Sequence, residues 1–157
     1  MLQPEPEAAS DAGWIKVSCD ASDGLRIVTV IAVLGAAAAV VLGLAGLPSV
    51  DLHGPLHKTG IMDPFCGGTR AAHYTMIGQW GLAWKYNPLG IAAVLGAGLA
   101  VVRALVGVAL GRWLNLALPS SPRRRAVLFG VVVLLVVALE VRQQLRADLL
   151  LEGTSRF

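Results

Sequence analysis

The sequence predicts an all-α membrane protein with three transmembrane helices and a short amphipathic or re-entrant helix in the loop between the first two. Of its 157 residues, 55% are hydrophobic and 15% are charged, whereas a soluble domain has roughly 25% charged residues. Three long apolar segments account for this composition. The basic residues flank these segments and form no patch with interleaved aromatic residues, so the net charge of +3 does not predict nucleic-acid binding.

The N-terminal region, residues 1–24, is acidic and rich in turn-forming residues, and we expect it to be a cytoplasmic tail. It lacks the basic start and the apolar core of a signal peptide. The first predicted span, residues 27–47, is long enough to cross roughly 30 Å of hydrocarbon. Within it, Gly35, Ala39 and Gly43 recur at a spacing that permits close helix packing, although ordinary small-residue content would also produce this spacing.

The second predicted span covers residues 88–111, with Pro88 in the first helical turn and Asn87 as the expected N-cap. The third covers residues 126–146 and is expected to continue as helix to about Leu151, because its leucines keep a helical stripe. Residues 25–151 are therefore predicted to form one transmembrane domain, and residues 152–157 a short C-terminal tail.

The connection between the second and third spans carries the strongest positive cluster, which consists of Arg112, Arg123, Arg124 and Arg125. Short positive loops stay on the cytoplasmic side of a membrane. We therefore expect a cytoplasmic N-terminus, with the loop 48–87 and the C-terminus outside. This orientation places Cys19 and Cys66 on opposite sides of the membrane, so they cannot form a disulfide with each other.

The outer loop, residues 48–87, is broken into turns by glycine and proline as far as Thr69. We expect residues 70–85 to form one short helix, capped by the Thr69 hydroxyl. Trp80 and Trp84 share one stripe of this helix with His73, and tryptophan favours the headgroup level of a bilayer. Two interpretations remain open: a surface-lying connector helix, and a re-entrant element that contributes to a site.

The same loop gathers residue types that bind metals. A mixed zinc site would use ligands that fit no standard spacing, namely His53, His57, Asp63, Cys66 and His73. The alternative is that Cys66 is simply a small buried apolar residue. The backbone amides of residues 67–69, with Arg70, would also suit a lipid headgroup phosphate. No Walker-type lysine accompanies them, and we expect no cofactor.

Residues 60–70 read GIMDPFCGGTR, and YNPLG follows at residues 86–90. This pattern resembles a family of small bacterial integral membrane proteins, domain of unknown function family 2752, whose signature is G-[IL]-x-C-P-x-C-G-x-T-R followed by N-P-L. The resemblance implies a membrane protein of this topology, and it implies no activity. Asp63 stands where the family pattern has its first cysteine, so Asp63 and Cys66 cannot form the disulfide that a C-x-x-C pair provides.

Two charged residues, Arg103 and Glu140, interrupt the second and third spans. Such groups usually face protein or a water-filled cavity. At about 1.5 Å per residue their depths differ by roughly 10 Å, so we do not expect them to pair. Arg103 is expected to extend towards the cytoplasmic headgroups or to meet a carboxylate of another subunit. Arg70 is the expected partner of Glu140, because both belong to the outer half.

The sequence favours a non-catalytic accessory subunit of a larger membrane complex in the bacterial inner membrane, with a respiratory-chain assembly as the expected host. Its partners would be larger integral membrane subunits and lipids. Docking or loop-anchoring roles are assigned to Asp63, Cys66, Thr69, Arg70, Trp80, Trp84 and Glu140. One alternative is a thiol- or metal-dependent enzyme or redox factor that uses Cys66, for which His73 is the nearby candidate base. Another is a small carrier or lipid-binding protein that uses Arg70, Arg103 and Glu140.

Overall fold

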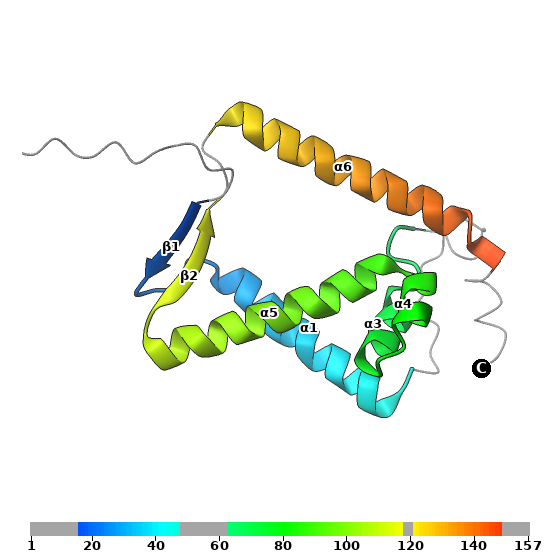
Figure 1. Ribbon diagram of the computed structural model, residues 1–157, viewed down its shortest axis with the longest axis horizontal. Helices are drawn as coiled ribbons and strands as arrows, with labels where there is room; N and C mark the ends of the chain where they lie inside the picture. Colours follow the sequence, from blue (N-terminus) through cyan, green and yellow to red (C-terminus); the bar gives the residue numbers. More distant parts are fainter. Residues whose placement is uncertain (1–15, 48–62, 118–120, 149–157) are drawn as a thin grey trace, which may run out of the picture.

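The computed structural model describes residues 16–47, 63–117 and 121–148. These ranges contain two strands and five helices: β1 (Lys16–Asp20), α1 (Arg26–Ala45), α3 (Gly68–Met76), α4 (Trp80–Tyr86), α5 (Pro88–Leu110), β2 (Trp113–Ala117) and α6 (Pro122–Gln144) (Figure 1). Helices α1, α5 and α6 are each long and apolar enough to cross a membrane. The predicted three-span fold is therefore confirmed, and the chain is a multi-pass membrane protein.

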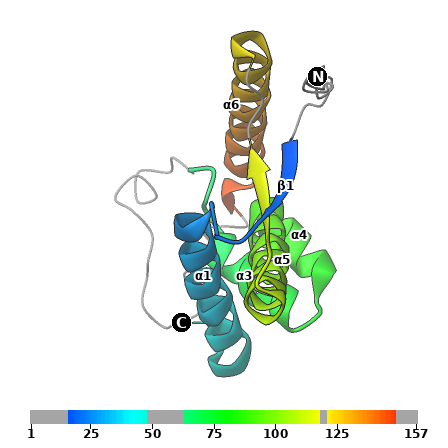
Figure 2. The same cartoon turned by 90° about the vertical axis from the view of Figure 1, so that its left-hand side faces the viewer.

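The centre of the fold is the antiparallel pair of α1 and α5, which lie side by side in Figures 1 and 2. The start of α1 and the end of α5 meet strands β1 and β2, and we call this the sheet end. The end of α1 and the start of α5 meet α3 and α4, and we call this the loop end. The two cysteines lie at opposite ends, with Cys19 in β1 and Cys66 just before α3.

Helix α5 begins and ends as its sequence predicts. Asn87 has an extended backbone, and its side-chain oxygen accepts a hydrogen bond from the Leu89 amide at 2.8 Å. Pro88 occupies the first turn, where its missing amide hydrogen is not needed. Gly111 ends the helix with φ of +62°, a left-handed conformation that glycine adopts without strain.

The loop helix differs from the prediction, because two helices, α3 and α4, replace one helix over residues 70–85. Gly78 lies between them with φ of +78°, which breaks the helical path. The predicted cap by the Thr69 hydroxyl is also wrong. Helix α3 begins two residues earlier, at Gly68, and its N-cap is Gly67, which has φ of +75°.

Strands β1 and β2 form an antiparallel two-stranded sheet, which the sequence analysis did not predict. Its register pairs Val17 with Leu116 and Cys19 with Leu114. Residues 16–20 had been assigned to the tail and residues 113–117 to a loop, but they pair across the first two spans. Residues 16–20 of the predicted tail therefore have a pairing partner within the same chain.

Glycines permit the close contacts of α5 with its neighbours. A Cβ atom added to Gly107 would lie 2.6 Å from a ring carbon of Trp113, so the indole packs flat against this helix. A Cβ atom added to Gly90 would lie 2.8 Å from the carbonyl oxygen of Gly68, so α3 approaches α5 backbone to backbone. In α1, Gly43 meets Met76 of α3 and Ala39 is buried, whereas Gly35 is exposed, so only the later part of the small-residue face packs on its neighbours.

Helix α6 stands apart from the other two spans. Within the described residues it makes no extensive contact with α1 or α5, and it approaches the rest of the fold only near its C-terminal end (Figures 1 and 2). Every residue from 125 to 138 is exposed. It begins at Pro122, four residues before the predicted span, and ends at Gln144, after which the chain turns. The predicted continuation to Leu151 runs partly outside the described residues.

Candidate functional site

The candidate site lies at the loop end and begins with a tight turn over residues 63–67. The Asp63 carboxylate accepts a hydrogen bond from the Phe65 amide at 2.7 Å, and the Asp63 carbonyl accepts one from the Cys66 amide at 3.0 Å. These bonds are typical of an Asx turn. They leave Cys66 only 4% exposed, beneath the N-terminus of α3. Asp63 therefore shapes the turn that positions Cys66.

Two fully buried amide side chains hold this turn against α5 and α6. Asn87 donates from Nδ2 to the carbonyls of Pro64 at 2.9 Å and Cys66 at 3.0 Å. Gln143 of α6 donates from Nε2 to the carbonyls of Cys66 and Tyr86, both at 3.1 Å. We call Cys66, Asn87 and Gln143 the loop-end clasp. The Cys66 carbonyl is its centre, because it accepts a bond from each of the other two.

Basic side chains of α6 reinforce the loop-end clasp from the surface. Arg142 donates to the Trp84 carbonyl, and its guanidinium carbon lies 5.9 Å from the centroid of the Trp84 ring. Arg146 donates to the Lys85 carbonyl at 3.0 Å. The two indoles that were expected at the headgroup level, Trp80 and Trp84, are 49% and 59% exposed. Arg142 and Gln143 of α6, and Arg146 just after it, thus tie the end of this helix to main-chain carbonyls of α4.

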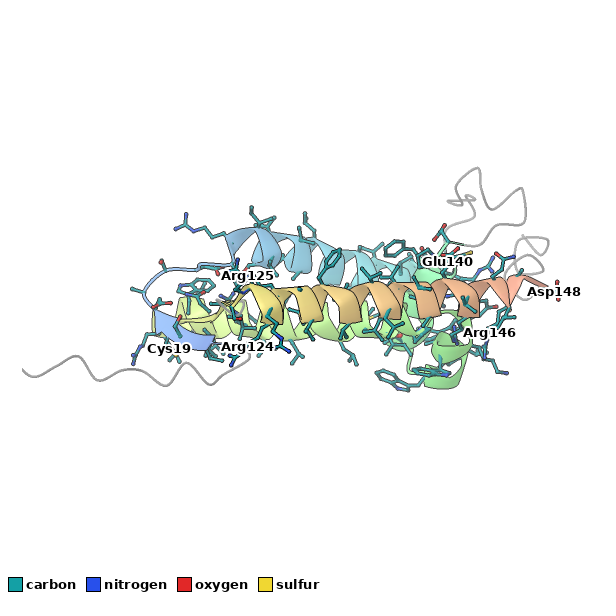
Figure 3. All side chains as sticks on the ribbon, turned by 90° about the horizontal axis from the view of Figure 1, so that it is seen from above. Cys19, Arg124, Arg125, Glu140, Arg146 and Asp148 are labelled. Carbon is teal, nitrogen blue, oxygen red and sulfur yellow. The ribbon has the colours of Figure 1, made fainter. Side chains whose placement is uncertain are left out.

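Arg70 lies inside an aromatic cluster. Its guanidinium carbon is 5.5 Å from the centroid of the Tyr86 ring, which stacks on Tyr74 at 5.5 Å. No ion pair between Arg70 and Glu140 is seen among the described residues, so their expected pairing is not confirmed. Glu140 lies one turn before the clasp on α6, at the loop end in Figure 3. The argument from depth placed both residues at one level of the membrane but could not place them on facing surfaces.

The comparisons with known proteins concern this same region. Residues 56–101 match the model of the family described as "Protein of unknown function (DUF2752)". We call the matched residues 56–101 the DUF2752 segment. Two further comparisons, with curated proteins and with solved structures, found no match. The DUF2752 segment contains the turn, α3, α4 and the start of α5, so it supplies Cys66 and Asn87 of the loop-end clasp, while Gln143 comes from outside it.

His73 and Thr69, also in the DUF2752 segment, lie apart from the clasp. His73 donates from Nδ1 to the Leu42 carbonyl at 2.6 Å and so joins α3 to the end of α1. Thr69 is exposed and lines a cavity of about 270 Å³ between α1, α3 and α5. Small and apolar residues form the rest of its wall: Gly35, Ala38, Ala39, Leu42, Gly68, Ala72, Ala93 and Val94. Of the described residues that line this cavity, none has a titratable side chain.

The predicted metal ligands do not form a cluster in the described part of the chain. Within these residues no group of three or more His, Cys, Asp or Glu side chains is placed to hold an ion. His73 bonds to the Leu42 carbonyl, and Asp63 caps its own turn. His53 and His57 lie outside the described residues.

The environment of Cys66 makes its thiol a poor nucleophile. Burial, and secondarily the charge of Asp63, raises the pKa of this thiol to about 11. The thiolate is the reactive form of cysteine, and a raised pKa makes it rare at neutral pH. Cys66 packs against Tyr86 and Ala147 as a small apolar residue would.

We therefore expect a maleimide at pH 7 to modify Cys19 and to leave Cys66 unmodified in the folded protein. Cys19 is exposed, whereas Cys66 is buried. Peptide mass mapping after labelling in mild detergent, with a denatured sample as the control, measures both positions. Rapid labelling of Cys66 in the folded state would contradict the burial described above.

A second polar cluster lies at the sheet end, around Arg103. Its guanidinium pairs with Asp23 at 2.8 Å and donates to Thr29 at 3.1 Å and to Asn115 at 2.9 Å. It also donates to the Leu114 carbonyl and lies 5.6 Å from the centroid of the Trp113 ring. Arg103 thus extends towards the end of its span that the sequence predicts. Its carboxylate partner is Asp23 of the same chain, and not a carboxylate of another subunit, which was the alternative.

This cluster predicts a stability that depends on pH. The hydrogen bond from Arg103 lowers the pKa of Asp23 from 3.8 to about 2. Because the folded-state pKa is the lower one, the pair stabilises the fold fully above about pH 4 and is lost as the pH falls through about 2. The difference in unfolding temperature between wild type and Asp23→Asn should be constant from neutral pH to about pH 4 and should shrink towards pH 2. A difference that does not shrink between about pH 4 and pH 2 would contradict the ion pair.

Proposed function

We propose that the protein is a non-catalytic accessory subunit that stabilises a larger membrane protein complex. The observation that carries this proposal is the isolation of α6. Its apolar residues 126–138 are all exposed, while residues 142–146, a few positions further on, are fastened to the loop end. Membrane helices associate through close packing, so the exposed length of α6, which packs on no other helix of the described residues, is open to other subunits.

The loop-end clasp supports this role because it fixes the position of α6 without covering it. Gln143 is fully buried and bonds through Nε2 to two main-chain carbonyls. Among the described residues its Oε1 atom has no hydrogen-bond partner. The hydrogen bonds that hold Gln143 to the turn and to α4 therefore all come from Nε2. A helix held at one end and open along the rest suits an arm that reaches a partner.

The alternative functions receive less support from the same geometry. An enzyme that uses Cys66 would need an accessible thiolate, and this thiol is buried with a raised pKa. A carrier would need mobile or accessible intramembrane charge, and Arg103 is held by Asp23, Thr29 and Asn115.

For the host membrane, we propose the bacterial inner membrane with a cytoplasmic N-terminus and an external C-terminus. Arg112, Arg124 and Arg125 belong to the sheet end, together with Cys19 of β1 (Figure 3). Short positive segments favour the cytoplasmic side. We propose a respiratory-chain assembly as the host, because such complexes recruit small helical subunits.

Affinity purification of the tagged full-length chain in mild detergent, followed by mass spectrometry, tests the accessory role. We expect a defined set of larger membrane subunits to be recovered with the wild type. A Cβ atom at Gly130 of α6 would meet nothing within 4 Å in this chain, so Gly130→Leu should keep the fold and reduce the recovery. Gly98→Leu on α5, where the space is also open, controls for the added side chain. Recovery of the chain alone would contradict the proposal.

A further inference from the structure

The two faces of the β1–β2 sheet differ in polarity. Side chains alternate between the faces of a sheet, and the register places two apolar cross-strand pairs on one face. All four of these side chains are exposed, and they are Val17, Cys19, Leu114 and Leu116. We call them the apolar sheet face. Ser18, Asp20, Trp113 and Asn115 form the opposite face.

On the polar face, Trp113 and Asn115 of β2 lie against the helices, whereas Ser18 and Asp20 of β1 are exposed. Asn115 accepts hydrogen bonds from Arg103 of α5 at 2.9 Å and from the Gly24 amide before α1 at 3.0 Å. Its Nδ2 group donates to Asp20 at 2.7 Å, and Trp113 packs on Gly107. In water, an antiparallel sheet packs its apolar face on the protein and turns its polar face to solvent. In this sheet the apolar face is the exposed one, as expected for an element that faces lipid.

The depth of the sheet agrees with a membrane surface. Only Gly111 and Arg112 separate α5 from β2, and Arg103, about two turns before the end of α5, bonds to Leu114 and Asn115. The sheet therefore lies beside the last turns of a transmembrane helix. Arg26 and Arg112 are exposed there, where arginine side chains reach the headgroup phosphates.

We propose that the apolar sheet face inserts into the interfacial layer of the bilayer leaflet at the sheet end. Insertion removes four apolar side chains from water, while the unpaired edges of the sheet stay at the headgroup level, where water can reach them. A two-stranded sheet is marginally stable by itself. The Arg103 cluster holds this sheet on its polar face, and lipid covers its other face.

Cys19 is a natural reporter for this proposal, because it lies on the apolar sheet face and Cys66 is buried. The full-length chain would be spin-labelled at Cys19 and reconstituted without other proteins into vesicles of phosphatidylcholine and phosphatidylglycerol. Collision of the label with oxygen, which concentrates in lipid, is compared with collision with a water-soluble nickel chelate. Cys19→Ser measures background labelling.

We expect the Cys19 label to collide more with oxygen than with the nickel chelate. In the Cys19→Ser background, Val17→Cys and Leu116→Cys should behave in the same way, whereas Ser18→Cys on the opposite face should show the reverse preference. This alternation along one strand would not arise from an unfolded segment, which would favour the nickel chelate at every position.

Two outcomes would overturn the proposal. A preference for the nickel chelate at Cys19 would show that the apolar sheet face is in water when no partner protein is present. Spin–spin broadening at Cys19 that disappears on dilution with unlabelled protein would show that a second copy of the chain covers this face. Either result leaves the accessory role to be judged by co-purification alone, because the vesicles contain no other subunit.

Discussion

Replacing Asn87 with alanine is expected to lower the free energy of unfolding by about 2–4 kcal/mol, from about 1 kcal/mol for a lost N-cap and about 1–3 kcal/mol for an unsatisfied buried carbonyl. Asn87 is fully buried, caps α5 and donates to the carbonyls of Pro64 and Cys66. The Cys66 carbonyl keeps its bond from Gln143, so the carbonyl of Pro64 bears the main loss. Unfolding in mixed detergent micelles measures the change.

Asn87→Ser separates the two contributions. Serine is also a good N-cap, so this variant can still accept a bond from the Leu89 amide but cannot donate to the two carbonyls. We expect its stability to lie between those of the wild type and Asn87→Ala. Equal stabilities for Asn87→Ala and the wild type would show that this residue does not hold the turn against α5.

The second large effect is expected from Gly90→Ala. The added Cβ atom would lie 2.6 Å from the Ala71 Cβ atom and 2.8 Å from the Gly68 carbonyl oxygen. Main-chain atoms cannot move aside as a flexible side chain can, so α3 has to shift away from α5. Overpacking of this kind typically costs about 1–3 kcal/mol, and the shift would also loosen the turn that carries Cys66.

Gly96→Ala is the matched control, because it lies on the same helix and its Cβ atom would meet nothing within 4 Å. Alanine is favoured over glycine inside a helix by about 1 kcal/mol, so this variant should be neutral or slightly more stable than the wild type. A Gly90→Ala variant as stable as Gly96→Ala would contradict the close approach of α3 to α5. The same unfolding assay compares the two.

The spans were predictable because each depends on a local property. Twenty or more apolar residues in sequence are enough to indicate a transmembrane helix. The start of α5 could also be predicted from a local signal, because Asn87 and Pro88 are typical of the first positions of a helix. The break at Gly78 was harder, because an isolated glycine within a helical pattern is often tolerated.

The sheet was missed although its signal was present. Residues 16–20 read KVSCD, which alternates in polarity with a period of two, and residues 113–117 read WLNLA, a short apolar run around Asn115. Each run is only five residues long, and one stood in a region otherwise rich in turn-formers. Neither run indicates by itself that a partner strand lies about a hundred residues away.

The contacts of the candidate site could not be predicted, because they join residues that are distant in the sequence. Cys66 was singled out from its motif, but Gln143 lies 77 residues further on and carries no motif. Arg103 and Asp23 are 80 residues apart, and their pairing depends on how the sheet folds back onto α5. Charge and depth alone suggested Arg70 for Glu140 and missed Asp23 for Arg103.

Photocrosslinking in cells tests the central claim, that α6 is the arm that contacts a larger subunit, most directly. A photoreactive amino acid would replace Phe129 or Leu134, which are 71% and 68% exposed. We predict that irradiation joins α6 to a discrete larger membrane protein, identified by mass spectrometry. Adducts to lipid alone from both positions, or to a second copy of this chain, would contradict the accessory role.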